Sequence, residues 1–172
     1  MRILILGLGV TGISVMRHYR NTAELVGFDE QFDRFSPDLR RMLRRNLSAI
    51  VTDRRLLAPK IRQAHRIVVS PGLPLRSLGL SASNPGVVGD LDIAYGKRRG
   101  GRFLAVTGTN GKTTTTKLLA SILTVHTGRS KVVVAGNIGT PLLNEVGKKS
   151  NLYYVVELSS FQLELARTFR PR

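Results

Sequence analysis

Cysteine is absent from this 172-residue sequence, and aromatic residues make up only 6% of it. The lack of cysteine excludes disulfides and thiolate metal sites and fits a reducing cytoplasm, where we expect the protein. No apolar run approaches the length needed to cross a bilayer, so we expect no membrane span. His18, His65 and His126 have neither metal-ligand spacing nor a paired nucleophile. A hydrophobic fraction of 42% predicts a globular chain.

Acidic residues are also few, since 11 Asp and Glu stand against 27 Lys and Arg, for a net charge of +16. Such an excess attracts polyanions, so a basic nucleic-acid-binding protein is one hypothesis. However, the basic clusters are scattered along the chain and no nucleic-acid-binding signature is present. We therefore expect a solvated basic surface with no specific nucleic-acid partner. Part of the excess would help to hold a substrate that carries several phosphates.

The first half alternates short apolar runs with helix-compatible stretches, which is the pattern of a parallel α/β unit. We predict a Rossmann-like parallel-sheet domain over residues 1–96. Its expected strands are Arg2–Leu6, Glu24–Phe28, Ile50–Thr52 and Ile67–Val69. Its expected helices are Gly12–Tyr19, Pro37–Arg45 and Leu56–Ala64.

The composition shifts to glycine and basic residues over 86–101, which places the predicted domain boundary near Tyr95–Gly100. From residue 97 to 172 we predict an incomplete P-loop-type α/β ATPase domain. Its expected strands are Phe103–Val106, Lys131–Ala135 and Tyr153–Glu157, with a long helix after Lys112. Because three strands make a small sheet with an open edge, we expect this second domain to be unfinished.

The residues between the strand at Phe103–Val106 and the following helix have the character of a phosphate loop. They are Thr107, Gly108, Thr109, Asn110, Gly111, Lys112, Thr113 and Thr114. Unpaired N–H groups at a helix N-terminus and two glycines favour the close approach of an anion. Lys112 would reach the β- and γ-phosphates of ATP, and the Thr113 hydroxyl would ligate Mg²⁺. The match is to a shorter form of the P-loop, because Val106 stands where the strict pattern has its first glycine. The alternative is a turn that binds no ligand.

A second glycine-rich turn, Gly7–Gly12, follows the first strand and matches the dinucleotide fingerprint. Asp29 follows at about the spacing of a ribose-binding acid. Taken alone, the turn indicates NAD and an oxidoreductase, although a glycine turn used only for packing is an alternative. The helix dipole favours a pyrophosphate without identifying the attached nucleoside.

Three further side chains follow expected strands, at the edge where α/β sheets bind ligands. Glu157 ends the strand at Tyr153–Glu157 and would hold Mg²⁺ beside the phosphates. Asn137 lies in a glycine-flexed loop and would bond a substrate, or would instead cap a helix near Pro141. Ser70 follows the strand at Ile67–Val69 and would line a ligand cleft, or would belong to an ordinary turn.

These motifs together resemble the Mur ligases over nearly the whole chain. The segments that carry the resemblance are 7–14, 70–72, 89–92, 108–113, 136–139 and 157–164. Asp92 departs mildly from the family, whose members commonly have glutamate there. The resemblance implies an ADP-forming ligase of peptidoglycan synthesis, with ATP and Mg²⁺ as cofactors. The substrates that it implies are UDP-N-acetylmuramoyl-L-alanine and D-glutamate, joined through an acyl phosphate.

The resemblance also assigns residues. Lys112 and Glu157 would be catalytic, and Thr113 and Glu157 would hold Mg²⁺. Val10 and Thr11 would face the diphosphate of the UDP substrate, with residues near Asp29 and Glu30 beside its uracil. The remaining substrate contacts would come from Ser70, Asn137 and Ser159.

Family members continue beyond the point that corresponds to Arg172, with a further metal-binding histidine, a carbamylated lysine and a third domain. We therefore expect the 172-residue chain to be an incomplete form without ligase activity, and to be monomeric. The alternative is a non-catalytic remnant that retains affinity for a UDP-sugar or nucleotide.

Overall fold

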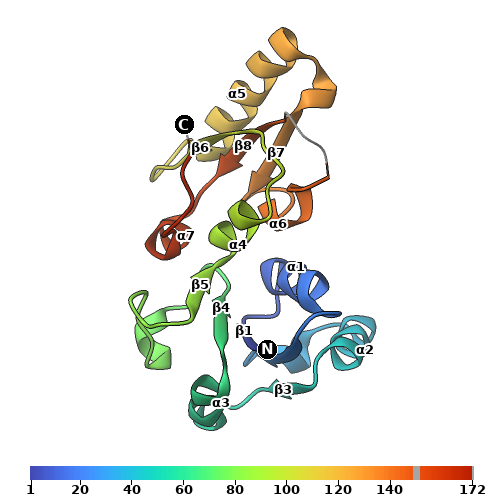
Figure 1. Cartoon of the computed structure of the whole chain (residues 1–172), viewed down its shortest axis with the longest axis vertical. Helices are drawn as coiled ribbons and strands as arrows, with labels where there is room; N and C mark the ends of the chain where they lie inside the picture. The colour runs from blue at the N-terminus through green and yellow to red at the C-terminus, as the bar shows by residue number, and fades with distance from the viewer. Residues whose placement is uncertain (149–151, 172) are drawn as a thin grey trace. The chain divides into compact units, whose positions relative to one another are not determined.

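The computed structural model describes residues 1–148 and 152–171. The chain forms two compact units, Met1–Asp90 and Leu91–Arg172, and each unit contains one parallel sheet (Figure 1). Helix α4 (Asp90–Gly96) begins at the last residue of the first unit. The boundary expected between residues 96 and 97 stays a prediction.

The first unit has a five-stranded parallel sheet with the strand order β3-β2-β1-β4-β5. Strand β1 lies between β2 and β4, so the chain reverses direction across the sheet at β1, as in doubly wound folds. The strands are β1 (Arg2–Leu6), β2 (Glu24–Phe28), β3 (Ala49–Val51), β4 (Arg66–Val69) and β5 (Val87–Gly89). The helices are α1 (Val10–Tyr19), α2 (Pro37–Asn46) and α3 (Leu57–Gln63), with short 3-10 turns at Phe32–Arg34, Arg54–Leu56 and Leu75–Leu78.

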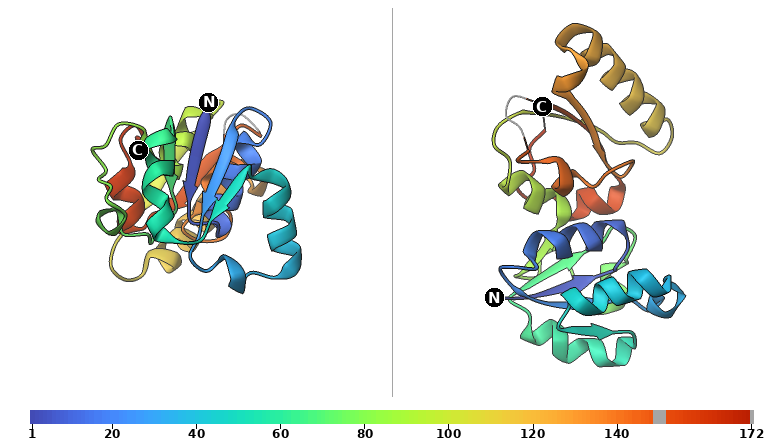
Figure 2. Two further views of the ribbon diagram at one scale, coloured as in Figure 1. Left: turned by 90° about the horizontal axis from the view of Figure 1, so that it is seen from below. Right: turned by 90° about the vertical axis from the view of Figure 1, so that its right-hand side faces the viewer.

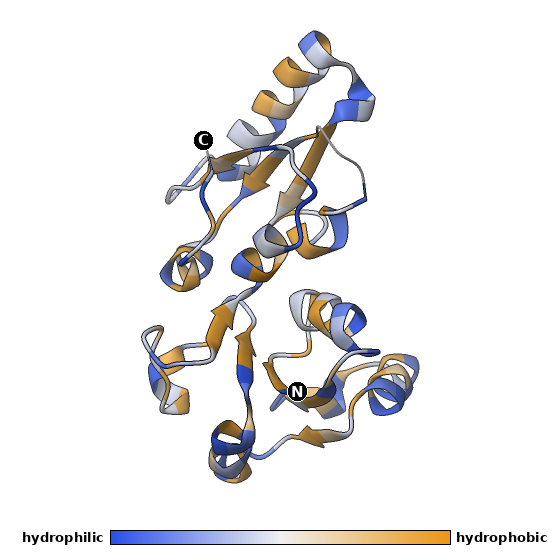
Figure 3. Ribbon diagram, viewed as in Figure 1, coloured by the Kyte–Doolittle hydropathy of each residue, from blue (hydrophilic) through white to orange (hydrophobic). Residues whose placement is uncertain are grey.

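The central strands of this sheet are apolar along their length because both of their faces are covered. Ile3, Leu4, Ile5 and Leu6 are at most 1% exposed. Helices α1 and α3 lie on opposite sides of the strands (Figure 2), and both contact β1. The strands are hydrophobic in Figure 3, whereas α2 is largely hydrophilic. The first unit therefore has one core, centred on β1 and β4.

The second unit has a three-stranded parallel sheet with β8 in the centre and the order β6-β8-β7. Its strands are β6 (Arg102–Val106), β7 (Val132–Gly136) and β8 (Tyr153–Glu157). Its helices after α4 are α5 (Lys112–Thr127), α6 (Leu142–Glu145) and α7 (Ser160–Leu165), with a 3-10 turn at Arg129–Lys131. Helix α5 packs on β7 and β8. This arrangement supports the predicted α/β fold with a Rossmann-like sheet and a partial P-loop-type sheet.

Aromatic rings fill the core of the second unit around Tyr154. The Tyr154 ring stacks on Phe103 with centroids 4.6 Å apart, and Tyr95 and Phe169 pack edge-on against Phe103. The Tyr154 hydroxyl is buried and has no hydrogen-bond partner in the described part of the chain. Burial raises the pKa of the Tyr154 phenol, and the nearby Glu145 carboxylate adds to the shift.

Asp92 on α4 anchors the segment that follows α7. Its Oδ2 accepts from the Arg167 N–H at 2.8 Å, and its Oδ1 accepts from the N–H groups of Thr168 and Phe169 at 2.9 and 2.8 Å. A single carboxylate thus satisfies three backbone donors after the helix has ended. Asp92, which stands where Mur ligases commonly have glutamate, thus has a structural role in this chain.

The expected strands and helices agree with the structure to within about two residues, and the strands at Arg2–Leu6, Glu24–Phe28 and Tyr153–Glu157 agree at both ends. The stretch 86–101, where the composition shifts, contains β5 and α4, which were not among the expected strands and helices. Within residues 1–148 and 152–171, none of the helices has the length and apolar character that crossing a bilayer requires.

Candidate phosphate and substrate sites

The phosphate loop (residues 107–111) joins the carboxyl end of β6 to the N-terminus of α5. Gly111 has a left-handed backbone with φ of +72°, which only glycine adopts without strain, and it directly precedes the first helical residue. No side chain in the described part of the chain caps this end of α5. The first N–H groups of the helix therefore face the loop without a side-chain acceptor, as an anion site requires.

The Lys112 ammonium lies against this loop. Its Nζ donates to the carbonyl oxygens of Gly108 and Thr109 at 2.7 and 3.2 Å. The ammonium is thus held over the loop by two neutral acceptors, which phosphate oxygens can replace with stronger, charge-assisted bonds.

Glu157 ends the central strand β8 and is only 2% exposed. Its Oε2 accepts from the Thr113 hydroxyl at 2.7 Å, and its Oε1 accepts from Asn137 Nδ2 at 2.9 Å. The strand register explains this convergence, because Glu157 pairs with Val106 of β6 and with Gly136 of β7. The three strands therefore end at one edge, where α5 and the loop after β7 bring Thr113 and Asn137 to the carboxylate.

The donor set at this edge fits Mg²⁺. Thr113 and Glu157 supply a hydroxyl and a carboxylate that already meet at 2.7 Å, and Mg²⁺ is commonly bound by one or two protein oxygens together with phosphates and water. Over residues 1–148 and 152–171, no group of three or more His, Cys, Asp or Glu side chains forms a protein-only metal cage. The residues therefore suit a metal ion that arrives with a nucleotide.

The remaining loop residues of the second unit differ in their surroundings. Thr109, Asn110 and Thr114 are exposed. Ser159 is the N-cap of α7, where its Oγ accepts from the Gln162 N–H at 3.2 Å and the Gln162 side chain accepts from the Ser159 N–H at 3.2 Å. The Ser-x-x-Gln spacing was a readable signal for this capping box, which sequence reasoning did not use.

The glycine turn of the first unit is closely packed. A Cβ on Gly12 would lie 2.0 Å from the Gly7 carbonyl oxygen, so only glycine fits at this point of α1. The Ser70 hydroxyl donates to that same carbonyl at 2.9 Å. Val10 is 67% exposed at the start of α1, and Thr11 is partly exposed beside it. The structure thus brings Val10, Thr11 and Ser70 to the carboxyl ends of the adjacent strands β1 and β4.

Asp29 has a structural role in this turn. Its Oδ2 accepts from the Leu8 N–H and its Oδ1 from the Gln31 N–H, both at 2.8 Å. Asp29, whose spacing indicated a ribose-binding acid, thus bonds the backbone of the turn through both of its carboxylate oxygens.

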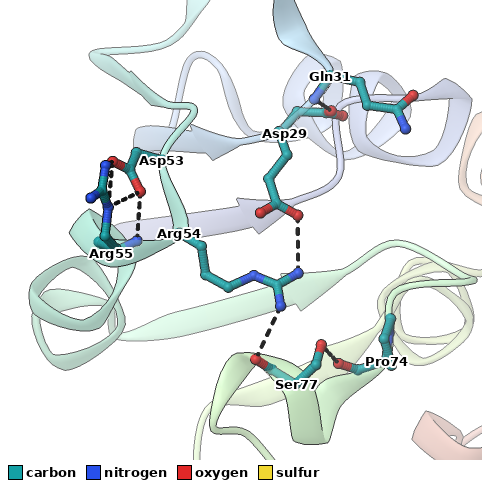
Figure 4. A network of polar contacts seen from close by, with 8 residues as sticks. Asp29, Gln31, Asp53, Arg54, Arg55, Pro74 and Ser77 are labelled. Atoms are coloured by element: carbon teal, nitrogen blue, oxygen red, sulfur yellow. Dashed lines mark hydrogen bonds and ion pairs between the residues drawn. The ribbon is translucent and has the colours of Figure 1, made fainter.

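A polar network next to Asp29 fixes the segments that follow β2 and β3 (Figure 4). Arg54 pairs with Glu30 at 2.9 Å and donates to the Ser77 carbonyl at 3.5 Å. The neighbouring Arg55 side chain bonds Asp53 and holds the pKa of that carboxyl below its usual range. Glu30, expected near the uracil, is thus engaged by an arginine that sequence reasoning did not assign.

Comparison with known proteins agrees with the two-unit structure. The family model "Mur ligase MurD-like, N-terminal domain" matches residues 1–88, and "Mur ligase middle domain" matches residues 106–170. The first of these covers half of the chain, so the chain belongs to the Mur ligase family.

The curated relatives of this chain include several proteins named UDP-N-acetylmuramoylalanine-D-glutamate ligase. That of Rickettsia prowazekii is 37% identical, and the alignment covers 98% of this chain and 36% of the relative. Those of Caldicellulosiruptor bescii and a Thermoanaerobacter species are each 34% identical, with 99% of this chain and 38% of the relative covered. The chain thus spans little more than a third of the length of these relatives.

A solved structure with weaker similarity is UDP-N-acetylmuramate:L-alanyl-gamma-D-glutamyl-meso-diaminopimelate ligase from Neisseria meningitides. It is 20% identical over 91% of this chain and 51% of that chain, with a TM-score of 0.43. This level of similarity adds nothing to the family assignment.

Proposed function

We propose that this chain supplies the UDP-substrate unit and the ATP-phosphate unit of a ligase that joins D-glutamate to UDP-N-acetylmuramoyl-L-alanine. The observation that carries the proposal is the convergence of Lys112, Thr113 and Glu157 at one sheet edge, in a chain whose relatives bear the name of that ligase. The proposed setting is peptidoglycan synthesis in the cytoplasm, and the proposed reaction class is ADP-forming amide ligation.

The proposed reaction has two steps. A carboxylate oxygen of the L-alanyl group attacks the γ-phosphorus of ATP, and the bond from that phosphorus to the bridging oxygen breaks to release ADP. The amine of D-glutamate then attacks the carbonyl carbon of the acyl phosphate. Phosphate leaves, the amine loses a proton, and the amide bond is complete.

Catalysis of phosphoryl transfer depends mainly on positioning and on neutralising charge. In this proposal, Lys112 exchanges its two carbonyl partners for β- and γ-phosphate oxygens. The free N–H groups of α5 and the loop residues Gly108 to Gly111 hold the remaining phosphate oxygens. Thr113 and Glu157 would hold Mg²⁺, which when bound neutralises part of the phosphate charge. Thr114 lies in the first turn of α5 beside them.

The substrate contacts are proposed from position. Val10 and Thr11 begin α1 and would face the diphosphate of UDP, with Ser70 directly after the adjacent strand β4. Asn137 and Ser159 would contact the muramoyl-alanine portion. Asn137 already donates to Glu157, so this contact would link substrate position to the carboxylate at the metal site.

The experiment that tests the proposal is calorimetric titration of the 172-residue chain with ATP and Mg²⁺. We expect binding that Lys112→Ala abolishes and that Lys117→Ala, an exposed lysine on the same helix, leaves unchanged. Equal affinity in the wild-type chain and Lys112→Ala would contradict the assignment of the phosphate loop.

A second titration addresses the first unit. We expect UDP-N-acetylmuramoyl-L-alanine to bind and NADH not to bind, because the relatives of this chain are named as ligases of a UDP substrate. Release of ADP in the presence of ATP, Mg²⁺ and D-glutamate would contradict the expectation that the 172-residue chain lacks ligase activity. Binding of this substrate without ADP release agrees both with an incomplete ligase and with the alternative of a non-catalytic binding protein. Light scattering would test the proposed monomer.

A further inference from the structure

A basic pocket of about 730 Å³ lies at the amino-terminal edge of the second sheet. Arg102 and Tyr153 are the first residues of β6 and β8, and Lys131 directly precedes β7. Because the strands are parallel, these starts share one edge, and the phosphate loop lies at the other. Arg98 and Arg170 complete the cationic lining. Four cations from separate segments thus converge away from the site described above.

Among the residues that the structure describes, none compensates the charge of the basic pocket. Its lining contains no aspartate or glutamate, and none of its four cations forms an ion pair within residues 1–148 and 152–171. Arg98 donates to the Tyr95 carbonyl at 2.6 Å and Arg170 to the Phe169 carbonyl at 3.1 Å. Neutral acceptors orient these guanidinium groups without cancelling their charge, which leaves the pocket suited to an anion.

The aromatic rings of the pocket also position its arginines. The Arg98 guanidinium lies 3.6 Å from the centroid of the Tyr95 ring. The Arg102 guanidinium lies 5.5 Å from that of Tyr153, and it donates to the Tyr153 hydroxyl at 3.1 Å. Because guanidinium groups already face these two rings, the rings are poorly placed to stack on nucleic-acid bases. The chemical group that the basic pocket is suited to bind is therefore phosphate, which arginine binds through two parallel hydrogen bonds.

We propose that the basic pocket binds a compact chain of two or more linked phosphates, independently of the phosphate loop. The volume lies within the range of about 300–1,000 Å³ that is typical of small-molecule sites. Inorganic polyphosphate and the phosphate tail of a nucleotide share this chemistry. The pocket is thus a second anion site at the opposite end of the same three strands.

The experiment uses the 172-residue chain with Lys112→Ala, so that the phosphate loop is disabled, and titrates it with inorganic tripolyphosphate. We expect one binding site per chain. Adding Arg98→Gln and Arg102→Gln should weaken binding about tenfold or more, since each change removes a charge-assisted contact. The matched control adds Lys117→Gln and Arg129→Gln, two exposed cations of the same unit that do not line the pocket. This control has the same net charge and should bind as the parent does.

Equal weakening of tripolyphosphate binding by the two pocket substitutions and by the two control substitutions would show diffuse attraction to the basic chain and would overturn the proposal. The absence of tripolyphosphate binding after Lys112→Ala would overturn it as well. A single-stranded oligonucleotide could instead bind more tightly than tripolyphosphate and lose this binding when Arg98→Gln and Arg102→Gln are added. That result would replace the proposed ligand with nucleic acid. Titration with ATP distinguishes inorganic polyphosphate from a nucleotide as the ligand. If ATP binds no more tightly than tripolyphosphate, the pocket holds the nucleotide by its phosphates alone. Should Arg98→Gln with Arg102→Gln fail to fold by circular dichroism, Lys131→Gln tests the same pocket.

Discussion

The Thr113 hydroxyl donates to the buried carboxylate of Glu157 across 2.7 Å, which joins the first turn of α5 to the end of β8. The hydroxyl and carboxylate oxygens that would hold Mg²⁺ therefore meet before any ligand is present. Such an arrangement lowers the cost of ordering these side chains when a nucleotide arrives.

Glu157→Gln should preserve the fold and weaken the binding of ATP with Mg²⁺. The glutamine amide can still accept from Asn137 and donate to the Thr113 oxygen, so both neighbours keep a partner. Loss of the charge should lower affinity about tenfold or more in the presence of Mg²⁺, with a smaller effect in its absence. Calorimetry with and without Mg²⁺ measures this difference. Glu164→Gln, an exposed change on α7, serves as the control, and an equal loss in both variants would contradict the role of Glu157.

Asn137→Ala should destabilise the second unit by about 1–3 kcal/mol, because it leaves one oxygen of a buried carboxylate without its donor. Asn137→Asp should destabilise more, since it places a second negative charge against Glu157. Urea unfolding followed by circular dichroism measures both. If Asn137→Asp were as stable as the parent at neutral pH, the contact between Asn137 and Glu157 would not contribute to stability.

Tyr154→Phe should leave stability near neutral pH unchanged or slightly raised, because the hydroxyl that it removes is buried and has no partner among the described residues. Its effect should depend on pH. The folded state raises the pKa of Tyr154, so stability from the neutral phenol is fully present below about pH 10 and falls as the pH rises through the folded pKa. Thermal unfolding between pH 8 and 11 should therefore show a steeper alkaline loss in the parent than in Tyr154→Phe. Parallel curves for the two proteins would contradict the direction of this shift.

Asp92→Ala should release the segment that follows α7, because one side chain accepts from three backbone N–H groups there. Amide hydrogen exchange at Arg167, Thr168 and Phe169 should accelerate. Asp92→Asn retains one acceptor oxygen and should give an intermediate rate. Unchanged exchange in Asp92→Ala would show that ring packing around Phe169 alone holds the segment.

The strands and the loop that joins β6 to α5 were predictable because their signals are local. Apolar runs such as Ile3–Leu6 and the Gly-x-x-Gly-Lys-Thr spacing identify an element and its end without knowledge of its neighbours. Strand β5 was missed because its three residues depend on pairing with β4, where Val87 lies opposite Ile67. A short strand of this kind gains its stability from tertiary contacts that sequence periodicity does not display.

Side-chain partners were less predictable than side-chain positions. Glu157 and Thr113 were expected at one edge, but the bond from Asn137 to Glu157 depends on rotamers that the sequence does not specify. The basic pocket was missed for a related reason. Arg98 and Arg102 are close in the sequence, but Lys131 and Arg170 are far from them along the chain, and only the folded structure brings the four together.

The length of the strands in the second sheet has a consequence for ligands at its two ends. Strands β6, β7 and β8 each contain five residues, which at about 3.3 Å per residue separates the two edges by roughly 15 Å. At physiological ionic strength, interactions between exposed charges are largely screened beyond about 8 Å. An anion at one edge therefore exerts little repulsion on an anion at the other, and the two edges should fill without cooperativity of either sign.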